Sequence, residues 1–353
     1  MAQSDIHFNV IGTAGHIVLD RPKALNALSA EMVQSMLAWL ARWRDDKAIS
    51  HIVVSSTSER AFCAGGDIRF ARDLILDGDF DKANEFFRNE YLADLAIAEF
   101  GKPVIALCNG VVMGGGAGIA EAATHIVVTE TTKFAMPESG IGLFPDAGAS
   151  LFLGRCPPSV SRLIGMTGHV INGADCLLYG LATVMVKSAR LKALEVDLLA
   201  SDAASIDSVI NQYKDDASAP SLPVHRQHID YVFADDLTAE EMRGRAVDLH
   251  QLYPDNPFIK TVADALGQRC PMSIKLFCRM MAVSRDFSTA AEALALEFRL
   301  AMRVIRRPDF AEGIRAVLID KDGAAKWSPA TLEDVTESML ADVFDATDLP
   351  PLR

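Results

Sequence analysis

The chain has 353 residues and 50% of them are hydrophobic, which is enough for a sizeable core and too many for a disordered chain. Its formal net charge of -13 argues against a nucleic-acid partner, because binding through phosphates requires a basic surface. No uninterrupted apolar stretch is long enough to span a bilayer, so a membrane protein is not expected.

The N-terminus and the cysteines bear on the cellular compartment. The segment 1–12 has neither a basic start followed by an apolar stretch nor the arginines of a transit peptide. The six cysteines form no CxxC pair, which is typical of free thiols in a reducing compartment. We therefore expect a cytoplasmic protein.

The first part of the chain predicts strands and helices in alternation. Residues 10–19 indicate a hairpin that turns at 12–15. Ser29 is a plausible N-cap of a helix whose apolar residues repeat at helical spacing. The apolar run 52–54 predicts a strand buried on both faces, and a glycine turn follows at 65–66.

The segment 102–149 contains the most informative pattern of the chain. An apolar run at 104–107 precedes three glycines, 114–116, and an alanine-rich helical segment then leads to a second apolar run at 126–128. The pattern predicts strand, glycine turn, helix and strand. Each glycine loses about 1 kcal/mol against alanine in a helix interior, so the triplet needs a reason. Backbone packing is one reason, and close approach of a ligand to backbone N–H groups is another.

The two glycine turns share a feature that bears on chemistry. Each follows a predicted strand and leads toward a helical segment, whose N-terminus offers unpaired N–H groups and a favourable dipole. Two N–H donors from two separate turns are what an oxyanion hole for a thioester or ester carbonyl requires. The alternative is that both are structural turns of an α/β sheet.

Two acidic residues, Glu138 and Asp146, lie in the loop that follows the run 126–128. The prolines and glycines around them exclude one regular helix, so the backbone must turn there. We expect that such a turn can bring the two carboxylates together.

The rest of the chain is predicted to be mainly helical after the last strand-like run, 183–186. Thr238 with Glu241 and Thr289 with Glu292 have the spacing of capping boxes. The segment 215–223 predicts an exposed connector between a core at 1–215 and a helical region at 224–353. Two apolar stripes are expected in the core: Leu294, Phe298, Ala301 and Ile305, and then Phe310, Ile314, Val317 and Leu318.

Three motifs, in this order and spacing, resemble the crotonase (enoyl-CoA hydratase/isomerase) superfamily: AFCAGGDI at 61–68, MGGGAG at 113–118 and FAMPESGIGLFPDAG at 134–148. Within it they are most similar to the branch of 3-hydroxyisobutyryl-CoA hydrolases. The similarity extends from RPKALNAL near the N-terminus to EFRLA, DFAEGIRAVLIDKD and KW near the C-terminus. The resemblance implies an α/β fold, a crotonase-like spiral of repeated ββα units with a helical C-terminal region.

The resemblance also implies residue roles. Gly66 and Gly115 match the oxyanion-hole residues, Glu138 the catalytic glutamate and Asp146 a second acidic residue. Glu138 either attacks the acyl carbon or activates water as a general base, and both routes stay open. Glu90 matches a substrate-contacting glutamate of the hydrolase branch; the alternative is a solvated helix position.

For coenzyme A, the resemblance places the adenosine and phosphate ends beside the first two motifs, along Gly66, Asp67, Ile68 and Arg69. For any single basic residue in that region, a solvated surface charge is the simpler interpretation. The basic residues in question are Arg21, Lys23, Arg60, Arg69 and Arg72. The residues expected to bind the acyl-CoA are Gly66, Asp67, Ile68, Arg69, Glu90, Gly115, Glu138 and Asp146.

The implied function is an acyl-CoA thioester hydrolase that cleaves 3-hydroxyisobutyryl-CoA to 3-hydroxyisobutyrate and CoA in valine catabolism. The main rival is a hydratase or isomerase on the same fold. Hydratases of the superfamily use a glutamate where this chain has Gly118, but dienoyl-CoA isomerases can carry an acid at the position of Asp146. A non-catalytic CoA-ester binding protein is the third alternative. We expect no cofactor and no metal. The expected small-molecule partner is the acyl-CoA substrate, and a homo-oligomer stays open.

Other chemistries have weaker support. His225 and His228 have helical ligand spacing, but no further metal pattern accompanies them. Cys63 has no identifiable partner histidine that would make it a nucleophile. No GxSxG motif is present.

Overall fold

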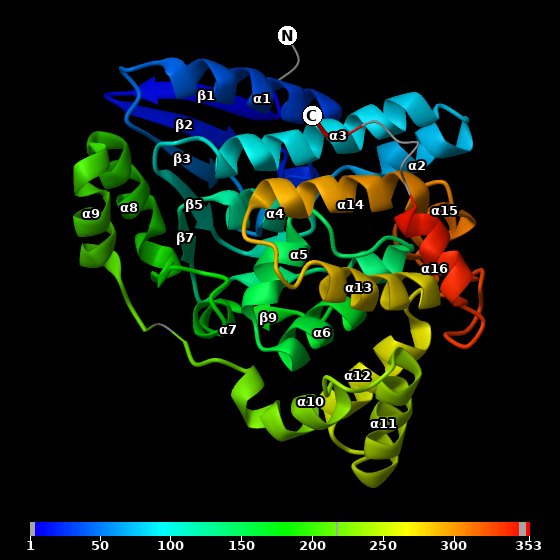
Figure 1. Cartoon of the computed structure of the whole chain (residues 1–353). Helices are drawn as coiled ribbons and strands as arrows, with labels where there is room; N and C mark the ends of the chain where they lie inside the picture. Colours follow the sequence, from blue (N-terminus) through cyan, green and yellow to red (C-terminus); the bar gives the residue numbers. More distant parts are fainter. Residues whose placement is uncertain (1–3, 217, 346–350) are drawn as a thin grey trace. The chain divides into compact units, whose positions relative to one another are not determined.

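A computed structural model describes residues 4–216, 218–345 and 351–353 of the chain (Figure 1). Residues 1–3 of the N-terminal segment and residue 217 of the predicted connector lie outside the described residues. The chain divides into two compact units, and each unit combines segments that are far apart in sequence. Unit 1 comprises Met1–Asp67, Asn89–Phe134 and Ile171–Ser221, and unit 2 comprises Ile68–Arg88, Ala135–Val170 and Leu222–Arg353.

This division differs from the predicted boundary at 215–224. The segments 68–88 and 135–170, which the prediction assigned to the core, belong to the same unit as the C-terminal helices. Aromatic packing is one physical reason, because the rings of Phe87 and Phe310 lie 6.2 Å apart between centroids. The chain passes between the units several times, so a boundary at one linker could not describe them.

Two sheets form the framework of unit 1. The six-stranded sheet has the order β1-β2-β3-β5-β7-β10, in which β1 runs antiparallel to β2 and the other neighbours are parallel. Its strands are β1 (Ile6–Ile11), β2 (Ala14–Leu19), β3 (His51–Ser56), β5 (Val104–Cys108), β7 (His125–Val128) and β10 (Val184–Met185). The four-stranded sheet has the order β4-β6-β8-β9. Its strands are β4 (Ala61–Cys63), β6 (Val111–Met113), β8 (Lys133–Ala135) and β9 (Ile171–Asn172).

The chain alternates between the two sheets, which confirms the predicted ββα repeat. In each repeat the first strand joins the six-stranded sheet and the second joins the four-stranded sheet, as in β3–β4 and β5–β6. The strands predicted at 52–54, 104–107 and 126–128 are β3, β5 and β7, and the opening hairpin is β1–β2. The short strands β4 and β6 were not predicted separately, yet they lead directly into the glycine turns. Because β4 and β6 are parallel neighbours, both turns leave the same edge of one sheet.

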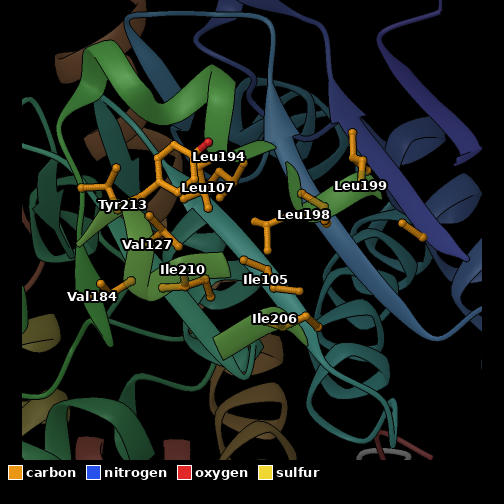
Figure 2. Close-up of a cluster of buried hydrophobic side chains, with 13 residues drawn as sticks. Ile105, Leu107, Val127, Val184, Leu194, Leu198, Leu199, Ile206, Ile210 and Tyr213 are labelled. Carbon is orange, nitrogen blue, oxygen red and sulfur yellow. The ribbon is translucent and has the colours of Figure 1, made fainter. Parts of the chain in front are cut away.

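Helices of unit 1 cover the six-stranded sheet with apolar side chains. Ser29 caps α1 (Ala30–Asp45), where its hydroxyl accepts the Met32 N–H at 3.2 Å, as predicted. Figure 2 shows the cluster in which α8 (Ser188–Ala200) and α9 (Ile206–Tyr213) pack on strand residues such as Ile105 and Val127. The remaining helices are η1 (Pro22–Ala24), α4 (Gly115–Ala122), α7 (Gly173–Leu178), η4 (Ala203–Ser205) and the part of α3 (Phe80–Ala98) from residue 89 onward.

Unit 2 is mainly helical, and after β10 the described residues contain no further strand, as predicted. Thr238 and Thr289 each begin a helix with a complete capping box, with Glu241 and Glu292 as the returning partners. The elements of unit 2 besides the start of α3 are α2 (Ile68–Leu76), η2 (Glu138–Ile141), α5 (Ala149–Phe152), η3 (Leu153–Arg155), α6 (Pro158–Thr167), η5 (Leu222–His225), α10 (Arg226–Val232), α11 (Ala239–Leu252), α12 (Pro257–Gln268), α13 (Pro271–Val283), α14 (Ala290–Val304), α15 (Pro308–Ile314), η6 (Arg315–Ile319) and α16 (Glu337–Phe344).

The two predicted apolar stripes have different outcomes. The stripe on α14 is fully buried, as expected. The second stripe is wrong at Val317, whose side chain is 41% exposed. The reason is that η6 is a π-helix, whose wider turn changes which residues face inward and buries Ala316 instead. Across the part of the chain that the structure describes, no helix is long and apolar enough to cross a membrane.

Candidate active site

The three glycines that open α4 are required for three different reasons. Gly114 is the N-cap and has a φ of 52°, a conformation that favours glycine. A Cβ on Gly116 would collide with the backbone carbonyl of Cys63, so α4 packs directly on the backbone of β4. A Cβ on Gly115 would collide with Oε1 of Glu90. Backbone packing and a polar group therefore both account for the triplet, at different positions.

The two glycine turns touch each other, as the oxyanion-hole hypothesis requires. A Cβ on Gly65 would lie 3.3 Å from the backbone nitrogen of Gly115, and a Cβ on Gly115 would lie 3.5 Å from that of Gly66. Leu28 holds the first turn from the side, since its N–H donates to Gly65 and its carbonyl accepts the Asp67 N–H at 2.9 Å. Gly115 is the first residue of α4, where a backbone N–H has no partner within the helix.

Glu90 lies between the two turns and not in solvent. Its side chain comes from α3 and is 5% exposed, so the alternative of a solvated helix position is wrong. Its Oε2 is 2.6 Å from where a Cβ on Gly66 would lie. The missing side chains of Gly66 and Gly115 thus leave the space that this carboxylate occupies. Unit 1 therefore brings together three of the predicted site residues.

Cys63, beside this carboxylate, is held as a thiol. Burial raises the pKa of Cys63 to about 12, with a smaller contribution from the negative charges of Glu90 and Asp94 and against a hydrogen bond with the Gly65 backbone. A thiol with such a pKa carries almost no thiolate at neutral pH, which argues against Cys63 as a nucleophile.

The acidic loop belongs to unit 2, where Glu138 begins the short helix η2. Its side chain is buried, and its carbonyl accepts the Leu143 N–H at 3.1 Å. The next residue, Ser139, donates its hydroxyl to the Met166 carbonyl at 3.1 Å and accepts the Cys270 N–H at 2.9 Å. The turn that carries Glu138 is therefore anchored both to α6 and to the start of α13.

Asp146 is buried and is followed by an unusual stretch of backbone. Ala147 has a φ of 54° and Gly148 a φ of 92°, so two successive residues adopt left-handed conformations. For an alanine this conformation costs about 1 kcal/mol, so other contacts must stabilise it. The Asp146 carbonyl accepts the Ala149 N–H at 3.0 Å, and α5 begins there.

Glu297 of α14 supplies the external contacts to this stretch. Its Oε2 accepts the Gly148 N–H at 2.6 Å, and its Oε1 accepts the Ser150 N–H at 2.7 Å. The side chain is 0% exposed. Burial raises the pKa of Glu297 to about 8, against the lowering effect of its hydrogen bonds to Ser150 and Gly148, and the charge of Asp146 adds to the rise.

Sequence reasoning missed Glu297 as a site residue. The signal was available in part, because Glu297 lies three residues after Leu294 and four before Ala301, on the stripe predicted to be core. An acidic residue on a buried helical face requires a partner. The identity of that partner could not be read from the sequence, because the bonded groups are 147 and 149 positions away.

The residues expected near coenzyme A are partly engaged with the protein. In unit 1, Asp67 pairs with Arg21, with the Nη1–Oδ2 distance at 2.8 Å. In unit 2, Ile68 and Arg69 begin α2, and the exposed Arg69 donates from Nη2 to the Leu318 carbonyl at 2.8 Å. These contacts hold the two arginines in place beside the first motif.

The histidines singled out by spacing have a structural role. His225 stacks on Phe258, with ring centroids 4.0 Å apart and an interplanar angle of 2°. Burial lowers the pKa of His225, and the neighbouring His228 lowers it further. Within residues 4–216, 218–345 and 351–353, no group of three or more His, Cys, Asp or Glu side chains is placed to hold a metal ion.

These features of fold and sequence define a class of protein. The chain matches the enoyl-CoA hydratase/isomerase family over residues 14–344 and therefore belongs to it. Solved structures agree: the carnitinyl-CoA dehydratase from Mycobacterium thermoresistibile superposes with a TM-score of 0.90 at 30% identity, covering 99% of each chain. The enoyl-CoA hydratase from Rhodobacter sphaeroides 2.4.1 gives a TM-score of 0.89 at 33% identity, over 99% of this chain and 100% of that one. The predicted crotonase-like α/β fold is confirmed.

Within the family, the chain is similar over nearly its whole length to proteins named 3-hydroxyisobutyryl-CoA hydrolase. It is 37% identical to the mitochondrial protein of that name from Gallus gallus, over 97% of this chain and 89% of that protein. The mitochondrial protein from Homo sapiens is 36% identical over the same shares. 3-hydroxyisobutyryl-CoA hydrolase 1 from Arabidopsis thaliana is 34% identical, over 95% of this chain and 91% of that protein.

Proposed function

We propose that this chain hydrolyses short 3-hydroxyacyl-CoA thioesters, with 3-hydroxyisobutyryl-CoA as its substrate, in the catabolism of valine. The observation that carries the proposal is the buried Glu90 carboxylate against Gly66 and Gly115. This carboxylate lies beside the two glycines, where it can accept a hydrogen bond from a hydroxyl group of the substrate. The names of the relatives from chicken, human and Arabidopsis support the same substrate.

In the proposed reaction, Gly66 and Gly115 stabilise the developing oxyanion. Their N–H groups bind the thioester oxygen as the carbonyl carbon becomes tetrahedral. One such donor typically lowers the barrier by about 3 kcal/mol. Glu90 accepts a hydrogen bond from the 3-hydroxyl group, which selects hydroxylated acyl chains. Buried polar partners of this kind discriminate strongly against substrates that lack the matching group.

Glu138 supplies the nucleophilic part of the reaction. It either attacks the acyl carbon, which gives a mixed anhydride that water then cleaves, or it removes a proton from water as water attacks. In both routes the C–S bond breaks, water supplies the new carboxyl oxygen, and CoA leaves as a thiol after protonation. Asp146 orients the attacking water. The reaction consumes water and needs no redox partner.

A second candidate function follows from the names of the solved structures, which include a dehydratase and a hydratase. Hydration of a double bond usually employs two carboxylates as acid and base. The first turn of α4 has Gly118 where hydratases of the superfamily carry one of them, which favours hydrolysis. Glu138 and Asp146 are nevertheless two carboxylates in one loop, so hydration is the rival to test.

The experiment is a panel of short acyl-CoA esters with detection of free thiol, run beside a crotonyl-CoA hydration assay. Hydrolysis predicts rapid thiol release from 3-hydroxyisobutyryl-CoA and slower release from the ester that lacks the 3-hydroxyl group. Fast hydration of crotonyl-CoA without thiol release would contradict the proposal in favour of the hydratase. Binding of the esters without turnover would favour the non-catalytic alternative.

The compartment is proposed as cytoplasmic. All six cysteines are free, and five of them are buried, which is consistent with a reducing compartment. The chicken and human relatives are named as mitochondrial proteins, which makes the mitochondrion the alternative location. Fractionation of cells that express the full-length chain would decide between the two.

A further inference from the structure

Glu297 is a buried acidic residue that the proposed reaction does not use directly. It lies on α14, and both of its carboxylate oxygens accept backbone N–H groups, from Gly148 and Ser150. Those two residues flank the start of α5, immediately after Asp146. The carboxylate thus binds the loop at the point where its backbone passes from Asp146 into a helix.

The bound stretch needs such support because its conformation is strained at Ala147. Ala147 and Gly148 both have positive φ values, 54° and 92°. Without Glu297, the Gly148 and Ser150 N–H groups would lose their acceptors in a buried environment, which destabilises this conformation relative to others. The backbone orientation at Ala147 determines where the adjacent Asp146 side chain points. A second contact holds the same stretch, because the Ser284 hydroxyl donates to the Ser150 carbonyl at 3.3 Å.

A carboxylate is an expensive choice for this task. Its side chain is fully buried, and burial together with the nearby charge of Asp146 raises the pKa of Glu297 to about 8, so ionisation is unfavourable there. A neutral side chain would avoid this repulsion. However, a carboxyl group presents two oxygens side by side, so it can face both N–H groups at once, whereas an amide presents one oxygen and an NH₂ group. Local choices that oppose stability in this way are expected at functional sites.

We propose that Glu297 is the positioning residue of the acidic loop: by binding the Gly148 and Ser150 N–H groups, it fixes the backbone on which Asp146 orients the attacking water. This inference rests on the proposed hydrolysis, in which Asp146 has that role. In this account Glu297 contacts the backbone of the loop. It acts through Asp146 alone.

The test is a double-mutant cycle in the full-length protein between Glu297→Gln and Asp146→Asn. Glutamine retains the size of the side chain but offers one acceptor oxygen and presents an NH₂ group to the second N–H. We expect Glu297→Gln to lower kcat for 3-hydroxyisobutyryl-CoA at least ~10-fold, since a small misplacement of a catalytic group costs up to about 100-fold. KM should stay within about twofold, because the loss concerns the chemical step. The double variant should be no slower than the slower single variant, because both changes remove one function.

The matched control is Glu195→Gln, a change at another buried glutamate. Glu195 lies on α8 in unit 1, where it accepts the Ser55 hydroxyl at 3.1 Å and pairs with Lys192 at 2.9 Å. This variant should lose thermal stability while kcat stays within about twofold of the wild type. If both glutamine variants lower kcat equally, Glu297 has a merely structural role and the inference is wrong.

Two further outcomes are decisive. Normal kcat in a folded Glu297→Gln protein, or losses that multiply in the double variant, would overturn the inference while the hydrolase proposal stands. A wild type that hydrates crotonyl-CoA and releases no thiol would overturn the proposed function itself. If Glu297→Gln fails to fold, Glu297→Asp keeps the carboxyl group with a shorter reach. It should lower kcat in the same non-additive way with Asp146→Asn, and multiplicative losses there would overturn the inference.

Discussion

The glycine turns of unit 1 and the acidic loop of unit 2 have separate tasks in the proposed reaction, and they are held in different ways. The turns at Gly66 and Gly115 are fixed by backbone contacts, through the parallel strands β4 and β6 and the hydrogen bonds of Leu28. The stretch after Asp146 is fixed by two distant side chains, the carboxyl group of Glu297 and the hydroxyl of Ser284. The comparison teaches that the glycine turns depend on the absence of side chains, whereas the acidic loop depends on hydrogen bonds to a few distant side chains.

The largest expected effect concerns Glu138, in the acidic loop. Glu138→Gln keeps the size of the side chain but removes its charge, its basicity and its competence as a nucleophile. Hydrolysis should fall at least ~100-fold, as expected for the loss of a positioned general base, and further if Glu138 attacks covalently. Steady-state kinetics with thiol detection measures the loss, and calorimetric titration with the CoA ester should show retained binding. Near-normal turnover would remove this residue from the reaction.

The two buried glutamates should respond to pH in opposite directions. The pKa of Glu297 is raised to about 8 in the folded state, mainly by burial, so its contribution to stability is fully present below pH about 4.5 and is lost as the pH rises through 8. Burial of Glu195 alone would raise its pKa, but hydrogen bonds from His16 and Lys192 outweigh burial and lower it to about 2. Its contribution is therefore present above pH about 4.5 and is lost as the pH falls through 2.

Urea unfolding between pH 5 and pH 7 tests this difference. In the wild type, Glu297 should lower the free energy of unfolding by on the order of 2 kcal/mol across this range, and Glu297→Gln should abolish that slope. Glu195→Gln should keep the wild-type slope, because Glu195 is ionised in both the folded and the unfolded state there. Equal slopes in the wild type and Glu297→Gln would show that Glu297 does not change its protonation on folding.

A smaller effect is expected at the glycine turns. Adding one methyl group to a glycine tests whether the space beside it serves substrate selection or packing. Gly115→Ala keeps the backbone N–H but displaces the Glu90 carboxylate, because the new Cβ would collide with Oε1. Hydrolysis of the 3-hydroxy ester should fall about 10-fold, the order expected for the loss of a hydrogen bond to a charged group, with little change for the ester lacking the hydroxyl.

The neighbouring Gly116→Ala is the control for that variant. Its Cβ would collide with the Cys63 carbonyl in the backbone of β4, so it should lower stability by about 1–3 kcal/mol without changing the preference between the two esters. The interpretation of Glu90 as the selector of hydroxylated substrates would be wrong if both variants changed that preference equally. Thermal unfolding and competition between the two esters provide the measurements.

The smallest effect is expected at Cys63, which lies beside the turns without a chemical role. Its pKa of about 12, raised mainly by burial, keeps it a thiol. Cys63→Ala should retain turnover within about twofold and lose some stability through the smaller side chain. Loss of hydrolysis in a folded Cys63→Ala protein would reopen the case for a cysteine nucleophile.

The sequence predicts features that depend on neighbouring residues better than features that depend on residues far apart in the chain. Local patterns were sufficient for the Ser29 cap, the two capping boxes and strands β3, β5 and β7, because each depends on neighbouring residues. The exposed Val317 was missed because a π-helical turn shifts the helical phase without a clear local signal. The contact between Glu297 and the acidic loop joins segments nearly 150 residues apart, which only the folded chain brings together.

The candidate site was predicted to a different degree in its two parts. The glycines of the second turn were identified because three successive glycines in a helical segment are costly and so require an explanation. The structure distinguishes the reasons: Gly116 for packing, and Gly115 for the Glu90 carboxylate. The division into two units was not predicted. The chain leaves unit 1 at residues 68–88 and again at 135–170, and each time it then returns to unit 1.

The central claim, hydrolysis of the thioester, is tested most directly by the fate of the oxygen from water. The wild-type protein is incubated with 3-hydroxyisobutyryl-CoA in ¹⁸O-labelled water, and the products are analysed by mass spectrometry. The account predicts equal amounts of CoA and 3-hydroxyisobutyrate, with one ¹⁸O atom in the carboxylate and none in the 3-hydroxyl group. An intact thioester that exchanges ¹⁸O into its 3-hydroxyl group, or loses that group to form a double bond, would show hydratase chemistry and contradict the account.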